Sequence, residues 1–207
     1  MIVIKTEFRL DEKDRIIFEA LQENPEATQQ GISSITGLSQ PSIGSRVKKM
    51  REMKIIDHIY GINLKNTGPY VLKVEVRSSN PKDLIKTFED CPFFLNGFVL
   101  TSEMNVTLMF ICEQINSLDA IVDNHIRPRS DVHEIDVGVI VTTERDAFVP
   151  VKVNITPNGT PSCGSPCQRC DYWFNGVCPG CPVTGYYRGE IFNRKMVRPV
   201  ETYNVSP

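Results

Sequence analysis

Residues 70 to 141 alternate between strand-like and helix-like patterns, and this order limits the possible folds more than any other feature of the chain. The strand-like runs are YVLKVEVR, FLNGFVLT, NVTLMFIC and the alternating apolar positions from Ile135 to Val141. Apolar residues recur at helical spacing in Pro81–Phe88 and Ser117–His125. The sequence therefore predicts the order strand-helix-strand-strand-helix-strand.

This βαββαβ order is the ferredoxin-like arrangement, an α+β fold in which an antiparallel sheet carries both helices on one face. We expect this domain to occupy residues 66–155. The face without helices should be apolar enough to pair with a second copy. We therefore predict a homodimer or a higher oligomer.

The bulk composition argues against a membrane partner and gives no general attraction to nucleic acid. No stretch approaches the roughly 20 apolar residues that span a bilayer, and the N-terminal apolar run is too short for a signal peptide. We expect a cytoplasmic protein that does not bind membranes. The formal net charge of −2 gives no general attraction to nucleic acid, so DNA binding would require a local basic patch.

The first 65 residues predict a winged helix-turn-helix. Asp11, Thr28 and Ser39 can each cap the start of a helix, and Gly37 suits the left-handed residue that ends the second one. After the third helix, the run IIDHIYGIN is typical of a short strand pair, which would form the wing. Residues 1–65 are therefore the predicted DNA-binding domain.

The third of these helices carries the local basic patch. Between Gln40 and Lys54 there are five basic residues and one acidic residue, Glu52. Basic side chains would contact the phosphates of double-stranded DNA, and small polar side chains at the helix start would enter the major groove. The alternative is a solvated basic face with no ligand. The candidate DNA-binding residues are Ser39, Gln40, Ser42, Ser45, Arg46, Lys48, Lys49 and Arg51.

The N-terminal segment carries a set of specific motifs: Leu10, Asp11 and Asp14, the turn Gly37-Leu38-Ser39, the helix residues Arg46, Val47 and Met50, and the pair Ile55-Ile56. With these residues the segment resembles the leucine-responsive regulator/AsnC (feast/famine) family of transcription regulators. The resemblance implies a DNA-binding transcription regulator. It also implies that the ferredoxin-like domain dimerises and binds a small-molecule effector, often an amino acid. The family's Gly-Asp-x-Asp-type turn reads Thr101–Asn105 here, so the effector stays open.

The C-terminal stretch CGSPCQRCDYWFNGVCPGC is the predicted metal site. Its candidate ligands are Cys163, Cys167, Cys170, Cys178 and Cys181. The two C-x-x-C pairs would give zinc four thiolate ligands. The spacing C-x-x-x-C-x-x-C is similar to that with which radical-SAM enzymes hold a 4Fe–4S cluster, so zinc and iron–sulfur stay open. The other alternative is a set of reducible thiols or disulfides.

Such a short segment cannot bury a core of its own, so we expect residues 156–207 to be a small module stabilised by the metal. We predict a DNA-binding regulator with metal or redox sensing through this module, and not an enzyme. One alternative is an enzyme similar to the sirohaem decarboxylases that share the two-domain fold. Another is a module that only docks a partner or braces the structure. We expect Cys91 and Cys112 to pack as small apolar residues, and the three histidines to have no catalytic role.

Overall fold

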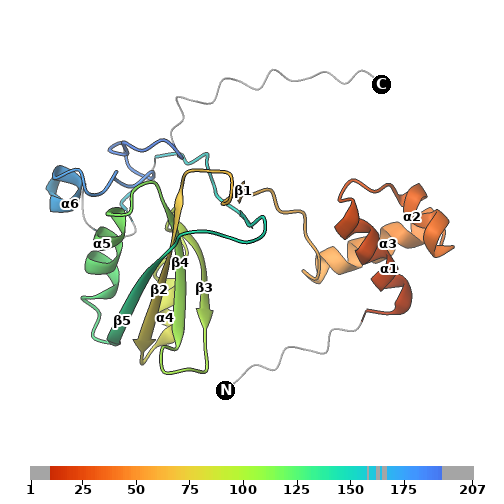
Figure 1. Ribbon diagram of the computed structural model, residues 1–207, viewed down its shortest axis with the longest axis horizontal. Coiled ribbons are helices and arrows are strands. Elements are labelled where there is room, and N and C mark those ends of the chain that lie inside the picture. Colours follow the sequence, from red (N-terminus) through yellow and green to blue (C-terminus); the bar gives the residue numbers. More distant parts are fainter. Residues whose placement is uncertain (1–9, 158, 162–163, 165–166, 193–207) are drawn as a thin grey trace. The chain divides into compact units, whose positions relative to one another are not determined.

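The computed structural model describes residues 10–157, 159–161, 164 and 167–192 (Figure 1). The chain divides into two compact units. The first ends at Ile59, and the second begins at Tyr60 and includes both the sheet and the cysteine segment. We call the described residues 159–192 the cysteine segment.

The first unit is made of three short helices, α1 (Glu12–Glu23), α2 (Gln29–Thr36) and α3 (Gln40–Glu52). Each helix starts at a residue whose side chain accepts a hydrogen bond from a backbone N–H of the first turn, and these caps are Asp11, Thr28 and Ser39. Gly37 ends α2 with a φ of +69°, a left-handed conformation that glycine adopts with less strain than residues that carry a Cβ. The predicted caps and the predicted left-handed glycine are confirmed.

The core of this unit comes from its own helices. Ile17, Ile32, Ile43 and Met50 are each at most 4% exposed and form one cluster. Burying an isoleucine or methionine side chain stabilises a fold by about 1.5–3 kcal/mol. Since only four apolar side chains are buried among the described residues of this small unit, its stability depends strongly on each of them.

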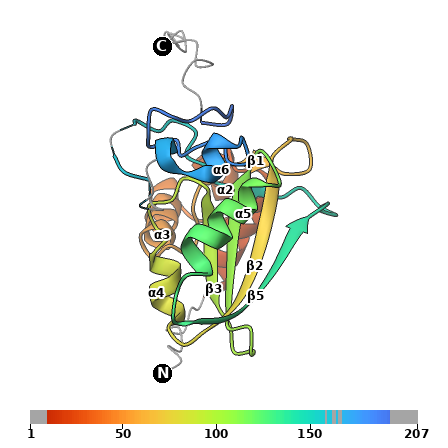
Figure 2. The ribbon, with the colours of Figure 1, turned by 90° about the vertical axis from the view of Figure 1, so that its left-hand side faces the viewer.

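The second unit is built on a four-stranded antiparallel sheet with the strand order β3-β4-β2-β5. Its elements are β2 (Tyr70–Ser78), α4 (Pro81–Lys86), β3 (Phe94–Val99), β4 (Val106–Cys112), α5 (Ser117–Ile121) and β5 (Val132–Ile140). The helices α4 and α5 lie on the same face of the sheet, as Figure 2 shows. The predicted βαββαβ order is confirmed.

The helix predicted over residues 117–125 is not uniform. It begins as the α-helix α5 and continues as a π-helical turn, η1 (Val122–Ile126). Val122 and Ile126 are buried against the sheet, whereas Asp123, Asn124 and His125 are only partly buried. A π-helical turn is wider than an α-helical turn. Such turns are rare in proteins overall, and those that occur often lie at functional sites. The periodicity of the sequence does not distinguish them from an α-helix.

The sheet face opposite the helices is less apolar than predicted, because it carries ion pairs beside its apolar residues. Lys73 pairs with Glu75 on β2 at 2.9 Å, and Arg77 pairs with Glu134 on β5 at 3.3 Å. An antiparallel sheet can keep one face in water, because its strands alternate apolar and polar residues. Any dimer would have to use other surfaces as well.

The strand pair predicted within IIDHIYGIN is also wrong. The only strand there is β1 (Ile62–Asn63), which pairs with β6 (Phe148–Val149). Gly61 lies so close to β6 that an added Cβ would be 2.7 Å from the carbonyl oxygen of Val149. The residues expected to form the wing therefore contribute a strand to the second unit.

The cysteine segment packs on the rest of the second unit, which we call the sheet unit. It contains a 3₁₀ turn, η2 (Cys167–Arg169), and a short helix, α6 (Asp171–Phe174). Glu113 at the end of β4 accepts hydrogen bonds from the hydroxyl of Tyr187 and from the backbone N–H of Glu190 and Ile191. Phe192 is 3% exposed and belongs to the core of the sheet unit. The described part of the segment therefore shares a core with the sheet.

Candidate nucleic-acid interface and cysteine cavity

The α3 surface presents the side chains that DNA recognition requires. Ile43 and Met50 point into the core of the first unit, which leaves the opposite side of α3 in solvent. Seven of the eight candidate DNA-binding residues are exposed on it: Ser39, Gln40, Ser42, Ser45, Lys48, Lys49 and Arg51. Small polar residues occupy the first two turns and basic residues the last two, so the groups suited to base readout and those suited to phosphate contact are separated along one helix.

Two of these exposed residues also stabilise the helix. The hydroxyl of Ser39 accepts a hydrogen bond from the backbone N–H of Ser42 at 3.4 Å and thereby caps α3. Lys48 lies 3.8 Å from Glu52, but both side chains are largely exposed. Exposed pairs of this kind contribute about 0–1 kcal/mol, so the ammonium group of Lys48 can exchange this partner for a phosphate.

Arg46, the eighth candidate, faces α1 instead. Its guanidinium is 2.5 Å from Asp11 and 2.7 Å from Asp14, and its side chain is 33% exposed against 78% for Lys48. The hydrogen bond from Arg46 holds the pKa of Asp11 below its ordinary value. The structure thus gives Arg46 an intramolecular role, in which it joins α3 to the capping box of α1. A phosphate would have to compete with two carboxylates for it.

The turn Thr101–Asn105, where the family has its Gly-Asp-x-Asp-type turn, ties two strands together. The side chain of Asn105 accepts a hydrogen bond from the N–H of Ser78 at 2.9 Å and donates one to the carbonyl of Ser78 at 2.8 Å. Asn105 thereby fixes the ends of β2 and β4. These contacts assign the asparagine a structural role at this turn.

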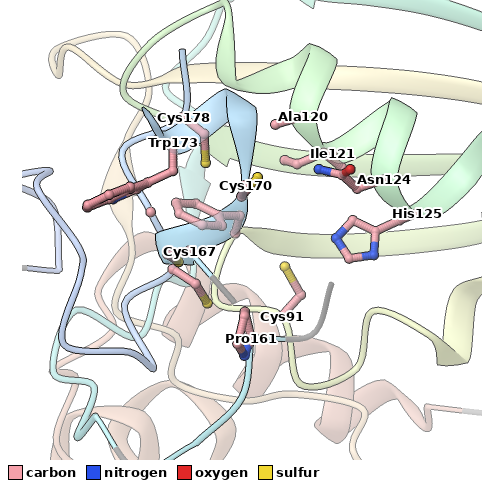
Figure 3. A pocket seen from close by; sticks show the side chains of 13 residues that line it. Cys91, Ala120, Ile121, Asn124, His125, Pro161, Cys167, Cys170, Trp173 and Cys178 are labelled. Carbon is pink, nitrogen blue, oxygen red and sulfur yellow. The ribbon is translucent and has the colours of Figure 1, made fainter. Parts of the chain in front are cut away.

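The second site is a cavity of about 60 Å³ between the cysteine segment and the sheet unit (Figure 3). Four of the predicted metal ligands line it: Cys167, Cys170, Cys178 and Cys181. The fifth predicted ligand, Cys163, lies outside the described residues. Residues separated by up to fourteen positions in the sequence are thus brought to one place, as their C-x-x-C spacing predicts.

Local backbone geometry positions these cysteines. Cys170 is the N-cap residue of α6, and the N–H of Cys178 donates to the carbonyl of Tyr172 at 2.9 Å. Gly180 has a φ of +88°, and an added Cβ would be 2.7 Å from the carbonyl oxygen of Tyr186. A side chain at this position would therefore be strained and would collide with the backbone. The glycine between Cys178 and Cys181 allows the tight loop that carries both.

Two adjacent aromatic residues of the segment, Tyr172 and Trp173, fix the structure beside the cavity. Trp173 lines it, donates a hydrogen bond from its indole N–H to the carbonyl of Tyr186 at 2.9 Å, and stacks under the guanidinium of Arg188 at 3.7 Å. Tyr172 donates its hydroxyl to Asp123 on η1 at 2.6 Å. Two adjacent aromatic residues thus serve two purposes, since one fixes the loop and the other fixes the segment to the sheet unit.

Six cavity residues come from the sheet unit, and two of them, Cys91 and His125, have side chains that can ligate a metal but are absent from the sequence-based site. Cys91 lies between α4 and β3, and His125 lies on η1. The prediction that Cys91 packs as a small apolar residue is confirmed, because it packs against the core of the sheet unit, but it also lines the cavity with the other cysteines. The odd total of seven cysteines was the only sequence signal that could have suggested a link to the cluster.

Cys112 provides the contrast. It is 1% exposed within the core of the sheet unit, and burial raises the pKa of its thiol to about 11. Such a thiol stays protonated and unreactive at neutral pH. The prediction that Cys112 packs as a small apolar residue is confirmed.

The cavity lining carries no lysine or arginine among the described residues. His125 packs edge-on to Phe88 with 5.6 Å between ring centroids, and burial lowers its pKa, which favours the neutral imidazole. The described histidine, cysteine and acidic side chains do not themselves form a group of three or more arranged to hold a metal ion. Any metal would therefore require the cysteine side chains to turn toward a common point.

Comparison with known proteins concerns first the helical unit that carries α3. Residues 10–57 match the family model of winged helix-turn-helix DNA-binding domains. Over 47 residues the chain is 47% identical to the HTH-type transcriptional regulator FL11 of Pyrococcus abyssi (strain GE5 / Orsay). That match covers 23% of this chain and spans 31% of the length of the relative. The first unit is a helix-turn-helix of the DNA-binding type.

Solved structures support the fold over a longer stretch. Escherichia coli AsnC is similar with a TM-score of 0.56 and 17% identity, covering 67% of this chain and 96% of its own. The leucine response regulatory protein of Mycobacterium tuberculosis gives a TM-score of 0.57 and 19% identity over 66% of this chain and 95% of its own. A transcriptional regulator of Neisseria meningitidis, solved as its L-methionine complex, gives 0.53 and 22% over 70% and 98%.

These similarities establish the fold. The chain has an α+β structure in which a helix-turn-helix precedes a sheet domain of the AsnC and leucine-regulator type. The three structures are covered almost completely, whereas about a third of this chain has no counterpart in them. No helix among the described residues is long and apolar enough to cross a membrane.

Proposed function

We propose that this protein is a sequence-specific DNA-binding transcription regulator. The observation that carries the proposal is the exposed side of α3, where small polar side chains precede basic ones on a helix-turn-helix of the DNA-binding type. Gln40, Ser42 and Ser45 would read base edges in the major groove, and Lys48, Lys49 and Arg51 would contact phosphates. Arg46 would hold the helix in place for them.

The experiment compares Lys49→Ala with a matched loss of charge elsewhere. Binding to a duplex of random sequence is measured by fluorescence anisotropy over a range of salt concentrations. Each lost phosphate contact lowers the slope of log affinity against log salt by about one. We expect this loss for Lys49→Ala and not for Lys82→Ala, an exposed lysine on α4. Equal slopes for both variants and the wild type would contradict the assignment of α3.

Sequence preference is tested separately through Gln40→Ala. Preferred duplexes are first selected from a random library with the wild-type protein. We expect Gln40→Ala to reduce the preference for the selected duplex and to leave random-sequence binding nearly unchanged, because base contacts specify and phosphate contacts position. A variant that weakens both equally would place Gln40 outside the base-reading set.

The second part of the proposal concerns the cysteine cavity. Its cysteines would bind a metal centre through thiolates, either Zn²⁺ or a 4Fe–4S cluster, and its loading would alter DNA affinity. Two features support this. The first is that four predicted ligands line one cavity. The second is that its described lining contains no lysine or arginine to balance the charge of thiolates, so a soft metal cation is suited to balance it.

Purification of the full chain without oxygen, followed by metal analysis and an absorption spectrum, tests this part. We expect zinc or iron in stoichiometric amount and its loss in Cys178→Ser. A sensor would change DNA affinity by the ~1–3 kcal/mol typical of coupled sites when the metal is removed. Unchanged affinity would make the metal a structural brace, and a protein with neither metal would end the metal proposal while leaving DNA binding intact.

The homodimer remains part of the proposal, with a revised surface. Phe98, Val99 and Leu100 are 44%, 53% and 39% exposed at the end of the edge strand β3. Exposed apolar residues on an edge strand are suited to pairing with a second chain. Analytical ultracentrifugation of the full chain and of Phe98→Glu tests it. We expect a dimer or larger species for the wild type and a shift toward monomer for the variant.

A further inference from the structure

Cys91 lines the same cavity as four cysteines of the C-terminal segment, although it lies far before them in the sequence. Figure 3 shows its sulfur directed into the cavity from the side opposite α6. Cys91 comes from the connection between α4 and β3, and Cys167 and Cys170 come from η2 and the start of α6. Cysteines from two parts of the chain therefore line one cavity.

The position of Cys91 is fixed by its own turn. Its N–H donates to the carbonyl of Phe88 at 2.9 Å, and its carbonyl accepts from the N–H of Phe94 at 3.0 Å. Phe88 and Phe94 stack on each other in the core of the sheet unit, with 5.8 Å between ring centroids. The core thus determines where Cys91 lies, independently of the cysteine segment.

The segment is held against the same part of the sheet unit by separate contacts. Tyr172, next to the cavity, donates to Asp123 on η1 at 2.6 Å. Glu113 holds Tyr187 and the backbone of Glu190 and Ile191. None of these contacts involves a sulfur atom. The position of Cys91 across the cavity from the other cysteines therefore follows from the packing of the backbone, and metal binding would need only side-chain rotations.

The chemistry of the lining favours coordination over a reactive thiol. A low-pKa nucleophilic cysteine needs a cationic neighbour or a helix N-terminus to stabilise its thiolate. The described lining offers Cys91 aromatic and aliphatic carbon, an asparagine, a histidine and other cysteines. Several cysteine side chains without a basic residue are suited to share one soft metal, which supplies the positive charge itself.

We infer that Cys91 is a thiolate ligand of the metal bound by the cysteine segment, so that the metal centre joins the segment to the sheet unit. The inference rests on the metal binding proposed above. A mononuclear thiolate centre uses four ligands. Five cysteines of the described residues line the cavity, so one of them would not bind the metal, and we expect Cys91 to be among the four that do.

The test compares three single substitutions in the full chain, prepared without oxygen. Cys91→Ser is the variant of interest, Cys178→Ser is the variant expected to lose the metal, and Cys112→Ser is the matched control outside the cavity. Zinc and iron contents are measured for each. For zinc, Co²⁺ is exchanged into the site and its thiolate charge-transfer band is recorded. For iron, the absorption and electron paramagnetic resonance spectra are recorded.

We expect Cys112→Ser to match the wild type and Cys91→Ser to lose the metal, or to bind it with an affinity reduced by more than the ~10–100-fold typical of outer-shell partners. Any residual Co²⁺ complex should show a weaker thiolate band. Cys91→His guards against a folding defect, because imidazole can replace a thiolate ligand. It should retain metal with an altered spectrum, whereas Cys91→Ala should not.

Each outcome separates this inference from the function on which it rests. If neither the wild type nor Cys112→Ser contains metal, the proposed metal binding fails. If the wild type contains metal, Cys178→Ser loses it and Cys91→Ala or Cys91→Ser keeps it with the wild-type spectrum, the inference about Cys91 is overturned while metal binding stands. A loss of only 10–100-fold with an unchanged cobalt spectrum would make Cys91 an outer-shell contact and would also overturn it.

Discussion

The helix-turn-helix unit and the cysteine segment both have strong sequence patterns, but they are held together differently. The helix unit closes its core with four buried side chains from its own three helices. The largest buried side chain of the cysteine segment, Phe192, belongs to the core of the sheet unit, and two carboxylates of that unit anchor the segment. A sharp motif therefore does not imply an independent module.

The largest effect should come from the core of the helix unit. We expect Ile43→Ala to lower its free energy of unfolding by about 2–5 kcal/mol, because the substitution leaves a cavity in a core of four residues. Circular dichroism would follow the helices. Trp173 is the only tryptophan of the chain, and its fluorescence reports on the second unit. If Ile43→Ala shifted the unfolding transition seen by Trp173 fluorescence together with the one seen by circular dichroism, the two units would not unfold independently.

The anchoring of the cysteine segment gives the next prediction. Glu113→Ala removes the acceptor of three hydrogen bonds, and each hydrogen bond to a charged group contributes about 1.5–3 kcal/mol. We expect Trp173 fluorescence to shift and limited proteolysis to cut the segment faster. Glu134→Ala, which removes only an exposed ion pair with Arg77, is the matched control and should change neither. Equal proteolysis of the two variants would contradict the anchoring role.

A smaller effect should distinguish the structural role of Arg46 from the DNA-contacting role proposed for Lys49 on α3. Replacing Arg46 by Gln should lower the melting temperature of the helix unit, because Asp11 and Asp14 lose their shared partner. Lys49→Gln should leave that temperature unchanged and lower DNA affinity. Differential scanning fluorimetry and DNA binding, measured on both variants, would separate the two roles. A reversed pattern would return Arg46 to the phosphate-contacting set.

The smallest effect should appear at low pH in the sheet unit. Arg129 lies 2.9 Å from Asp131, and the hydrogen bond lowers the pKa of that carboxyl. Its contribution to stability is complete above the ordinary aspartate value of about 3.9 and is lost as the pH falls through the lowered pKa. We expect the stability of the second unit to fall more steeply below about pH 4 in the wild type than in Asp131→Asn. Parallel pH profiles would contradict this.

Local patterns were sufficient for the first three helices and for the order of strands and helices along the sheet domain. The caps at Asp11, Thr28 and Ser39 and the left-handed Gly37 depend on neighbouring backbone atoms, so the sequence shows them directly. The alternation along β2 likewise determined which residues face the core. The π-helical turn at Val122–Ile126 could not be predicted, because the apolar spacing is compatible with either helix and packing decides between them.

The two candidate sites divide in the same way. The exposed polar and basic side of α3 follows from helical periodicity, and the sequence by itself determined it. The partner of Arg46, the pairing of Ile62 with Val149 and the place of Cys91 beside the C-terminal cysteines were decided only by the tertiary structure. Each of these contacts joins residues far apart in the chain. Their distances depend on how whole elements pack, and the pattern of neighbouring residues carries no information about that.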